Sequence, residues 1–270
     1  MTSFTVLSIA GSDSSGGAGT QGDLRTIAAF GGHGLSVITA VTAQGSDGVR
    51  GWWPVPREAI QAQLEAVLGL APDAAKTGML GDVAVAAAVA KGLRDFDGPI
   101  VVDPVCRSGS GADLLDVDAL DVLRAELIPL AALVTPNLAE AEVLTGIRVT
   151  DAEGQREAAQ RLVAMGAQAA LVKGGHLAGE PVDVLFDGAR FHDFAGERVH
   201  TEQTHGTGCA LASAIACALA TGQDLVAAVA TAKQWLTGAI RGGSPLAGAP
   251  GPVDHLWRQR LASPTQDLAT

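Results

Sequence analysis

The run His-Gly-Thr-Gly-Cys at residues 205–209 has the composition of an anion-binding turn. It precedes an alanine-rich apolar stretch, residues 210–220, which predicts a buried helix that begins at this turn. A helix start leaves backbone N–H groups without partners, and the helix dipole adds about half a positive charge there. Anions such as phosphate bind in this geometry. We therefore expect Gly206, Thr207 and Gly208 to stabilise a phosphoryl group.

Cys209 falls in the first turn of this predicted helix, where a thiol is shifted toward the thiolate. We expect it to accept a proton from a substrate hydroxyl. Two alternatives stay open. A free cysteine is often a small buried apolar residue, which is our interpretation of Cys106 and Cys217. Cys209 could also be the nucleophile of a cysteine hydrolase with His205, although no third group is evident that would orient the imidazole.

The glycine-rich loop from Gly11 to Gly19 directly follows an apolar run and favours a small-molecule pocket. No Lys followed by Ser or Thr comes after its last glycine, which excludes a P-loop. A G-x-G-x-x-G pattern begins at Gly17, seven residues beyond Ala10, whereas a dinucleotide site has its first glycine at the end of the strand. A tight turn without a ligand is the remaining alternative.

Three other segments carry polar residues at the ends of apolar runs. Asn137 and Glu140 form a capping-box pattern, and helix capping alone is enough to explain both residues. The alternative is that they help to hold Mg²⁺ beside a nucleotide phosphate. Asp103 ends the run Ile100-Val-Val-Asp and could share that task. Lys173-Gly-Gly-His176 closes another run, and either charged residue could simply be solvated. Such ends of one parallel sheet converge on a single crevice.

The elements that must position these residues alternate between strand and helix patterns. Such alternation predicts an α/β fold, with a mostly parallel sheet covered by helices on both faces. A hairpin signal around Asp187-Gly188, within residues 181–200, predicts a small antiparallel addition. The predicted strands are Thr5–Ala10, Leu35–Thr42, Pro99–Asp103, Ala132–Thr135 and Ala169–Lys173.

Helix signals lie between these strands. Pro56 with Glu58 predicts one helix start, Asp116 or Asp118 a second, and Asp151 a third. Apolar residues at steps of three and four predict a further helix over residues 225–240. No linker or repeat divides the chain, so we expect one domain over residues 1–262 and a flexible tail over residues 263–270.

The composition excludes several classes of protein. The chain has 270 residues, of which 47% are hydrophobic, and a formal net charge of −11 without a basic cluster. The negative net charge and the lack of a basic cluster make nucleic acid a poor partner. No apolar run reaches the roughly 20 residues of a membrane span, and no export signal precedes the first strand. The three cysteines show no C-x-x-C spacing. We expect a cytoplasmic protein without a disulfide framework.

Eight segments in this order resemble the bacterial hydroxymethylpyrimidine and phosphomethylpyrimidine kinases of thiamine biosynthesis, a branch of the ribokinase-like superfamily. The resemblance covers residues 5 to 257. The segments are Ile9–Gly19, Thr39–Gln44, Lys76–Leu80, Val102–Val105, Thr135–Glu140, Lys173–His176, His205–Cys209 and Gly251–His255. It implies a three-layer α/β/α fold, frequently a homodimer, that uses Mg-ATP. The reaction it implies is phosphorylation of 4-amino-5-hydroxymethyl-2-methylpyrimidine and then of its monophosphate.

The same resemblance implies a role for each matching residue. Gln44 matches the pyrimidine-binding position, and an amide that both donates and accepts suits a ring nitrogen beside an amine. Cys209 matches the position of the base, which is an Asp in most of the superfamily. The remaining implied sites are Gly11, Asp23, Met79 and Val105 near the pyrimidine, Asn137, Lys173 and His205 for ATP, and Asp103 and Glu140 for the metal.

Related pyridoxal kinases share much of the pattern, so pyridoxal kinase activity is the alternative function. Gln44 and His176 favour the pyrimidine, because the pyridoxal enzymes tend to differ at these positions. A binding protein that senses the pyrimidine without turnover is a further alternative. The chain departs from the family at Cys106, where Met is common, in the following loop, residues 107–111, and after Gln44, where Asn is common.

Overall fold

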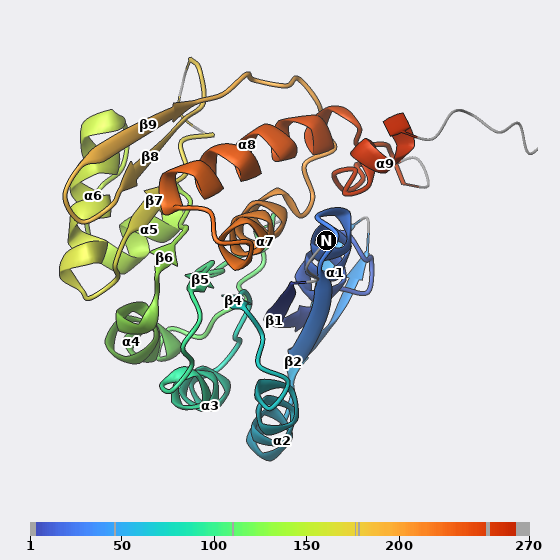
Figure 1. Cartoon of the computed structure of the whole chain (residues 1–270), viewed down its shortest axis with the longest axis vertical. Helices are drawn as coiled ribbons and strands as arrows, with labels where there is room; N and C mark the ends of the chain where they lie inside the picture. Colours follow the sequence, from blue (N-terminus) through green and yellow to red (C-terminus); the bar gives the residue numbers. More distant parts are fainter. Residues whose placement is uncertain are drawn as a thin grey trace, which may run out of the picture.

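The computed structural model describes residues 4–45, 47–109, 111–175, 177, 179–246 and 249–262. Within these residues, nine strands form one sheet in the order β3-β2-β1-β4-β5-β6-β7-β8-β9 (Figure 1). The strands are β1 (Thr5–Ser12), β2 (His33–Gly45), β3 (Gly48–Pro54), β4 (Ala74–Thr77), β5 (Ile100–Val102), β6 (Leu133–Val134), β7 (Ala170–Val172), β8 (Val182–Phe186) and β9 (Phe191–Ala195).

The centre of the sheet is parallel and its edges are antiparallel. Strands β2, β1, β4, β5, β6 and β7 run parallel, whereas β3 pairs antiparallel with β2, and β8 and β9 form an antiparallel hairpin beside β7. This confirms the predicted parallel sheet, its five predicted strands and the hairpin. The sequence patterns missed β3 and β4. Strand β4 is only four residues long and includes Lys76, which hides its apolar character.

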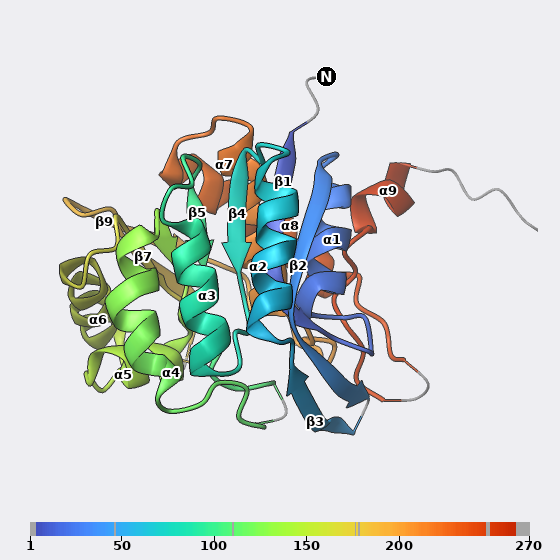
Figure 2. The same ribbon diagram turned by 90° about the horizontal axis from the view of Figure 1, so that it is seen from below.

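Helices cover both faces of the sheet, as predicted. The helices are α1 (Gly19–Ala29), α2 (Arg57–Leu68), α3 (Val83–Leu93), α4 (Ala119–Val122), α5 (Leu138–Thr145), α6 (Ala152–Ala164), α7 (Thr207–Ala220), α8 (Leu225–Arg241) and α9 (Trp257–Ala262). Helices α2, α3, α5 and α6 pack on one face, and α1, α7 and α8 pack on the other (Figures 1 and 2). The sheet is therefore the middle one of three layers.

Local sequence explains most helix starts. The Asp151 carboxylate accepts the backbone N–H of Gly154 at the start of α6, and Pro56 precedes α2, both as predicted. Asp118 occupies the N-cap position of α4, but its side chain makes no capping hydrogen bond, so the predicted cap is wrong there. Helix α4 continues into a π-helical turn, residues 123–127. The apolar stripe of α8 is buried and includes the fully enclosed Trp235.

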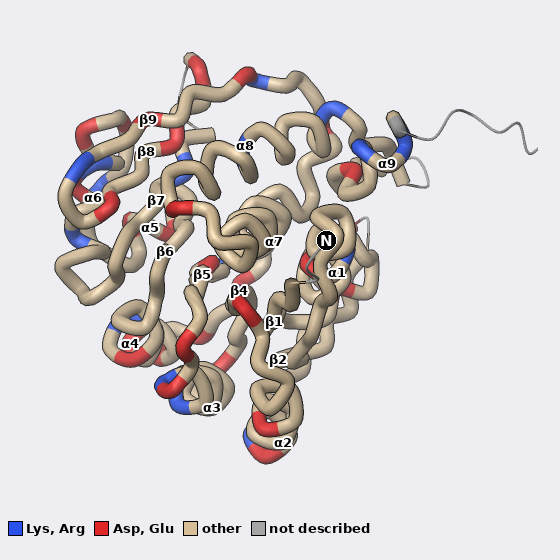
Figure 3. Tube along the Cα trace, in the orientation of Figure 1, with Lys and Arg blue, Asp and Glu red and all other residues tan. Residues whose placement is uncertain are grey.

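Acidic and basic residues lie close together on α6 (Figure 3). Among the described residues, no helix combines the length and apolar character that crossing a bilayer requires.

A single domain over residues 1–262 stays a prediction, which the shared sheet supports. The predicted tail, residues 263–270, lies outside the described residues.

Candidate active site

The predicted site residues meet at the carboxyl edge of the parallel strands. Gly11 lies near the end of β1 and Gln44 near the end of β2, while Asp103 and Lys173 directly follow β5 and β7. Because parallel strands end at the same edge, their loops lie together there, and α7 begins beside Lys173 and Asp103. The predicted convergence of these segments is therefore confirmed.

The first turn of α7 reaches this edge through close backbone packing. Gly206 has a φ of +83°, and a Cβ there would lie only 2.0 Å from the carbonyl oxygen of Gly17, so no other residue fits. A Cβ on Gly208 would lie 3.4 Å from Nζ of Lys173 and 3.7 Å from Oδ2 of Asp103. The start of the helix thus lies beside a lysine ammonium, which reinforces its attraction for anions.

Lys173 and Asp103 form an ion pair at this start of α7. Nζ of Lys173 lies 3.0 Å from Oδ1 of Asp103, and the side chains are 15% and 3% exposed. The Thr135 hydroxyl donates to the same carboxylate oxygen, at 3.2 Å. Burial lowers the pKa of Lys173, but Asp103 and Glu140 outweigh it and raise the pKa above its ordinary value. The ammonium therefore stays charged at neutral pH.

Asn137 and Glu140 form the predicted capping box at the start of α5. The Asn137 side chain accepts the Glu140 backbone N–H at 2.9 Å, and the Glu140 carboxylate accepts the Asn137 backbone N–H at 2.8 Å. Burial raises the pKa of Glu140 to about 7; Lys173 opposes this rise, and Asp103 adds to it. Glu140 and Asp103 are thus two carboxylates that repel each other beside one lysine.

A second lysine–aspartate pair lies sealed beneath the site. Nζ of Lys76 lies 3.0 and 2.9 Å from the two carboxylate oxygens of Asp23, and the side chains are 1% and 0% exposed. Ser8 and Ser213 donate to the same carboxylate at 2.6 and 2.8 Å. The structure therefore buries Asp23 completely beneath the site. A direct contact with substrate would require one of these bonds to exchange.

Cys209 lies within electrostatic range of both pairs, but its pKa differs from the prediction. Burial raises the pKa of the thiol to about 11; Lys76 opposes this effect, while Asp23 and Asp103 add to it. The predicted lowering by the helix start is therefore wrong for the ligand-free chain, because enclosure outweighs the helix dipole. Cys106, beyond the end of β5, is likewise held as a thiol, since burial raises its pKa to about 12.

An apolar cluster forms the other half of the site. Met79 packs with Ala40 and Leu114, and Val105 and Trp52 lie against them. A Cβ on Gly11 would lie 3.0 Å from the Met79 sulfur, so this glycine lets β1 approach the cluster. The structure thus brings the predicted substrate residues Gly11, Met79 and Val105 together. Gln44 stands at the end of β2, half-buried.

The His205 side chain contacts Asp13 and Gln44, and its predicted role in ATP binding stays a prediction. Its Nε2 lies 2.8 Å from Oδ2 of Asp13 and 3.4 Å from Nε2 of Gln44. Burial alone would raise the pKa of Asp13, but hydrogen bonds from His205, Ser15 and Ala18 outweigh it and lower the pKa to about 2. Sequence reasoning missed Asp13 as a site residue, although its place within the first glycine-rich loop was a usable signal.

The hydrolase alternative finds no support in these contacts. Among the hydrogen bonds of the described residues, none joins His205 to Cys209, so the pairing of a nucleophile with a base is missing. Arg107 forms an exposed ion pair with Asp113 in the loop that departs from the family, residues 107–111. His176, one of the two positions that discriminate pyrimidine from pyridoxal, lies outside the described residues, as does Ser110.

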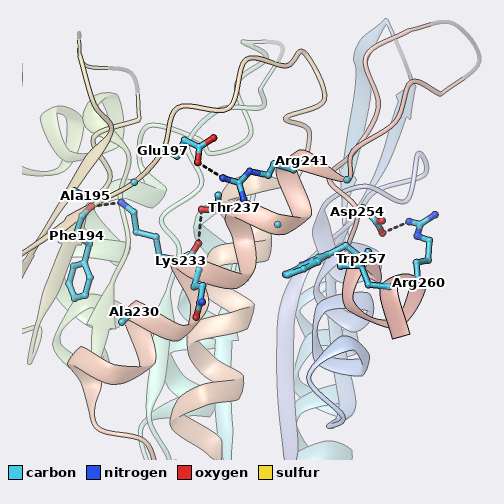
Figure 4. Close-up of a pocket in the computed structure, with 15 residues that line it drawn as sticks. Phe194, Ala195, Glu197, Ala230, Lys233, Thr237, Arg241, Asp254, Trp257 and Arg260 are labelled. Atoms are coloured by element: carbon cyan, nitrogen blue, oxygen red, sulfur yellow. Dashed lines mark hydrogen bonds and ion pairs between the residues drawn. The ribbon is translucent and has the colours of Figure 1, made fainter. Parts of the chain in front are cut away.

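A pocket of about 830 Å³ lies between β9, α8 and α9 (Figure 4). Phe194, Lys233, Thr237 and Trp257 line it. Lys233 donates to one oxygen of Asp183 at 2.8 Å. The other oxygen accepts the backbone N–H of Gly174, the residue after Lys173, also at 2.8 Å. One carboxylate therefore ties the pocket wall to the turn that carries Lys173.

Comparisons with known proteins agree with this geometry. The family model described as phosphomethylpyrimidine kinase matches residues 13–254. The chain is 51% identical over 253 residues to a hydroxymethylpyrimidine/phosphomethylpyrimidine kinase of Streptomyces coelicolor, covering 93% of this chain and 94% of that one. It is 50% identical to the thiamine biosynthesis bifunctional protein ThiED of Geobacter sulfurreducens, with 93% of this chain and 52% of that protein aligned.

Among solved structures, the pyridoxal kinase of Staphylococcus aureus in complex with AMP-PCP and pyridoxal superposes with a TM-score of 0.89. Its sequence is 33% identical, and the match covers 97% of this chain and 96% of that one. That relative, which shares the fold, therefore binds an ATP analogue together with pyridoxal.

Proposed function

The chain belongs to the phosphomethylpyrimidine kinase family, and from this membership we propose that it transfers a phosphoryl group from ATP to 4-amino-5-hydroxymethyl-2-methylpyrimidine and then to the monophosphate, in thiamine biosynthesis. Pyridoxal is the alternative substrate, favoured by the structural likeness to a pyridoxal kinase. Sequence identity is higher to the pyrimidine kinases, at 51% against 33%.

One observation carries the proposal: the start of α7 reaches both an apolar half and a charged half of the site, through the contact of His205 with Gln44 and the position of Gly208 beside Lys173. Met79 and Gln44 lie on the apolar side, where a flat heteroaromatic ring can bury its faces. Lys173 lies beside Gly208 on the charged side, where backbone N–H groups and an ammonium can hold the phosphates. A hydroxymethyl group bound on the first side then faces a phosphate bound on the second.

The chemistry is an in-line phosphoryl transfer. The hydroxymethyl oxygen forms a bond to the γ-phosphorus, the bond from that phosphorus to the bridging oxygen breaks, and ADP leaves. The hydroxyl proton passes to the Cys209 sulfur in the thiolate form. The Lys76 ammonium favours that form against burial. Backbone N–H groups of Gly206, Thr207 and Gly208 stabilise the charge on the moving phosphoryl group.

Asp103 and Glu140 fit a Mg²⁺ ion at the charged side. Burial and the charge of Asp103 raise the pKa of Glu140 to about 7, and a divalent cation held by these carboxylates would relieve their repulsion. Mg²⁺ prefers one or two carboxylates together with phosphate oxygens and water. When bound, the ion would neutralise negative charge on ATP. Asn137 keeps the Glu140 carboxylate in place through the capping box.

We further place the adenosine part of ATP in the 830 Å³ pocket beside α8. Strand β9 is antiparallel to β8 and therefore runs in the same direction as β7, so it ends, at Phe194 and Ala195, on the same edge of the sheet as Lys173. Lys233 contacts both the Phe194 carbonyl oxygen and the Asp183 carboxylate, which in turn accepts the Gly174 backbone N–H. An ATP molecule held through its phosphates at Lys173 can extend in this direction. The aromatic rings of Phe194 and Trp257 offer apolar surface for the base.

We also propose a cytoplasmic homodimer. Three free cysteines suit a reducing compartment. The exposed Val41 and Trp53, on the paired strands β2 and β3, supply apolar surface for a second copy. Sedimentation velocity measures the oligomeric state directly.

The decisive experiment follows Mg-ATP turnover by the purified chain on three substrates separately: the hydroxymethylpyrimidine, its monophosphate and pyridoxal. Mass spectrometry identifies the products. We expect the pyrimidine mono- and diphosphates, with little pyridoxal phosphate. Turnover of pyridoxal alone would move the function to the pyridoxal branch. Binding of the pyrimidine without ATP consumption would leave the sensor alternative.

A further inference from the structure

The contacts of His205 determine which way the Gln44 amide faces. A glutamine amide can occupy two orientations related by a half-turn, which exchange its donor NH₂ and its acceptor oxygen. The two orientations present opposite hydrogen-bonding patterns to a ligand. The neighbours of the amide therefore decide what Gln44 can recognise.

Asp13 fixes the proton on His205. Its carboxylate accepts from the backbone N–H groups of Ser15 and Ala18 and from the Ser15 hydroxyl, at 2.8 to 2.9 Å. These donors hold the carboxylate in place and keep it ionised. An ionised carboxylate only accepts, so Nε2 of His205, at 2.8 Å from Oδ2, must carry a hydrogen.

The Nε2–H group then constrains Gln44. The Gln44 atom 3.4 Å from Nε2 of His205 is the amide nitrogen. A protonated Nε2 has no lone pair that could accept from the amide nitrogen. Its single hydrogen points to Asp13, and a half-turn of the Gln44 amide brings the amide oxygen to where it can share that hydrogen in a three-centre bond. The backbone of Gln44 cannot adjust instead, because Ser14 donates to its carbonyl oxygen and accepts from its N–H, both at 2.8 Å.

We propose that the Asp13–His205 pair locks the Gln44 amide with its oxygen toward His205, and that this lock makes the site select a 4-aminopyrimidine over a 4-oxopyrimidine. The proposal rests on the proposed function, in which Gln44 faces the pyrimidine. The 4-amino compound presents an amine donor beside an acceptor ring nitrogen. Its 4-oxo analogue presents an acceptor oxygen beside a ring N–H, the reverse pattern.

A free amide could turn to match either compound, but a locked one matches only one. With the mismatched compound, the locked amide leaves hydrogen-bonding groups unpaired within the site. Such unpaired groups are the strongest means of rejecting a close analogue. Asp13 and His205 are thus positioning residues, since they act through Gln44.

The test compares kcat/KM for 4-amino-5-hydroxymethyl-2-methylpyrimidine and its 4-oxo analogue in three proteins: the wild type, His205→Leu and His205→Gln. Leucine removes the N–H group, whereas glutamine can still donate one hydrogen to Asp13 and one to Gln44. We expect His205→Leu to lower the ratio of amino to oxo kcat/KM by about 10-fold or more. We expect His205→Gln to restore most of that ratio.

A structural role for His205 would lower both kcat/KM values in parallel. A ratio unchanged in His205→Leu would therefore overturn the inference while turnover of the amino compound upholds the proposed function. A wild type that uses both compounds equally would also overturn the inference. Circular dichroism of each variant verifies its fold.

A second measurement is independent of activity. Nitrogen-15 NMR of the labelled, ligand-free chain reports which imidazole nitrogen of His205 carries hydrogen, with His205→Gln identifying the signal. We expect a protonated Nε2. An unprotonated Nε2 would overturn the inference even if turnover of the pyrimidine failed, so failure of the proposed function remains distinguishable.

Discussion

Two lysine–aspartate pairs lie at neighbouring strands of the same sheet, and they differ in how far solvent reaches them. Lys76 in β4 and Asp23 in α1 are sealed, and two serines complete the carboxylate. Lys173 and Asp103, beyond β7 and β5, are joined by an ion pair of similar length, but Lys173 remains 15% exposed at the start of α7. A sealed pair sets a fixed field, whereas an open pair can exchange partners with a ligand.

The two pairs also influence the protonation of Cys209. Both lysines and both aspartates act on its pKa, which burial raises to about 11. The sealed pair supplies a field that does not change during turnover. In the proposed function, phosphate and a cation bind at the open pair and would change its field, which would couple the acidity of the thiol to the occupancy of the charged half.

Removal of Lys76 should have the largest effect and fall on stability. Lys76→Met leaves the Asp23 carboxylate buried with only its two serine donors. Loss of one partner from a buried pair costs about 3–5 kcal/mol of the free energy of unfolding. Urea unfolding followed by circular dichroism measures this loss. The double variant Lys76→Met/Asp23→Asn should recover part of it; no difference between single and double variants would contradict a sealed ion pair.

The matched change in the open pair should act on catalysis instead. Lys173→Met removes an ammonium beside the moving phosphoryl group, and loss of one such group lowers kcat by about 10²–10³-fold. The loss of stability should be smaller than for Lys76→Met, because solvent reaches this end of the site. Steady-state kinetics and urea unfolding on the same protein separate the two effects. Equal stability losses in the two variants would break the comparison between the pairs.

Cys209 should distinguish the two phosphorylation steps. The first step needs a base for the hydroxyl proton, while in the second the nucleophile is a phosphate oxygen that is already largely ionised. Cys209→Ala should therefore slow the first step by about 10²-fold and the second by much less. Separate assays of the two substrates measure both. Equal losses would argue against the base role.

The pH dependence follows from the same pKa. Because the Cys209 pKa is raised to about 11, the thiolate is scarce at neutral pH and increases as the pH rises toward that value. The rate of the first step should therefore climb with pH, by about tenfold per unit below the pKa. The Cys209→Ala variant should lose this slope, and the second step should show little of it in the wild type.

The smallest effect should come from the capping box beside the open pair. Asn137→Ala removes an N-cap and should cost about 1 kcal/mol of stability. Glu140→Gln retains an acceptor for the Asn137 N–H and should leave stability nearly unchanged. If Glu140 also holds Mg²⁺, this variant should raise the Mg²⁺ concentration needed for half-maximal activity. Mg²⁺ titrations of both variants test this; an unchanged requirement in Glu140→Gln would assign the residue to capping alone.

Sequence by itself determined the layered fold and the edge at which the site lies. Runs of branched apolar residues fix β1 and β5 because a strand buried on both faces has little freedom in composition. Asn137 with Glu140 encodes a cap through local spacing alone. These features depend on neighbours along the chain, so one sequence suffices to predict them.

Tertiary structure alone determined the charge pairing and the protonation of the site residues. The pKa of Cys209 rises because enclosure by distant segments outweighs the helix dipole, which the local sequence could not show. Asp23 faces Lys76 and two serines brought together from β1, β4 and α7, and His205 turns toward Asp13, 192 residues earlier. Burial and charge pairing depend on which segments meet in space, and that information is not contained in residue spacing.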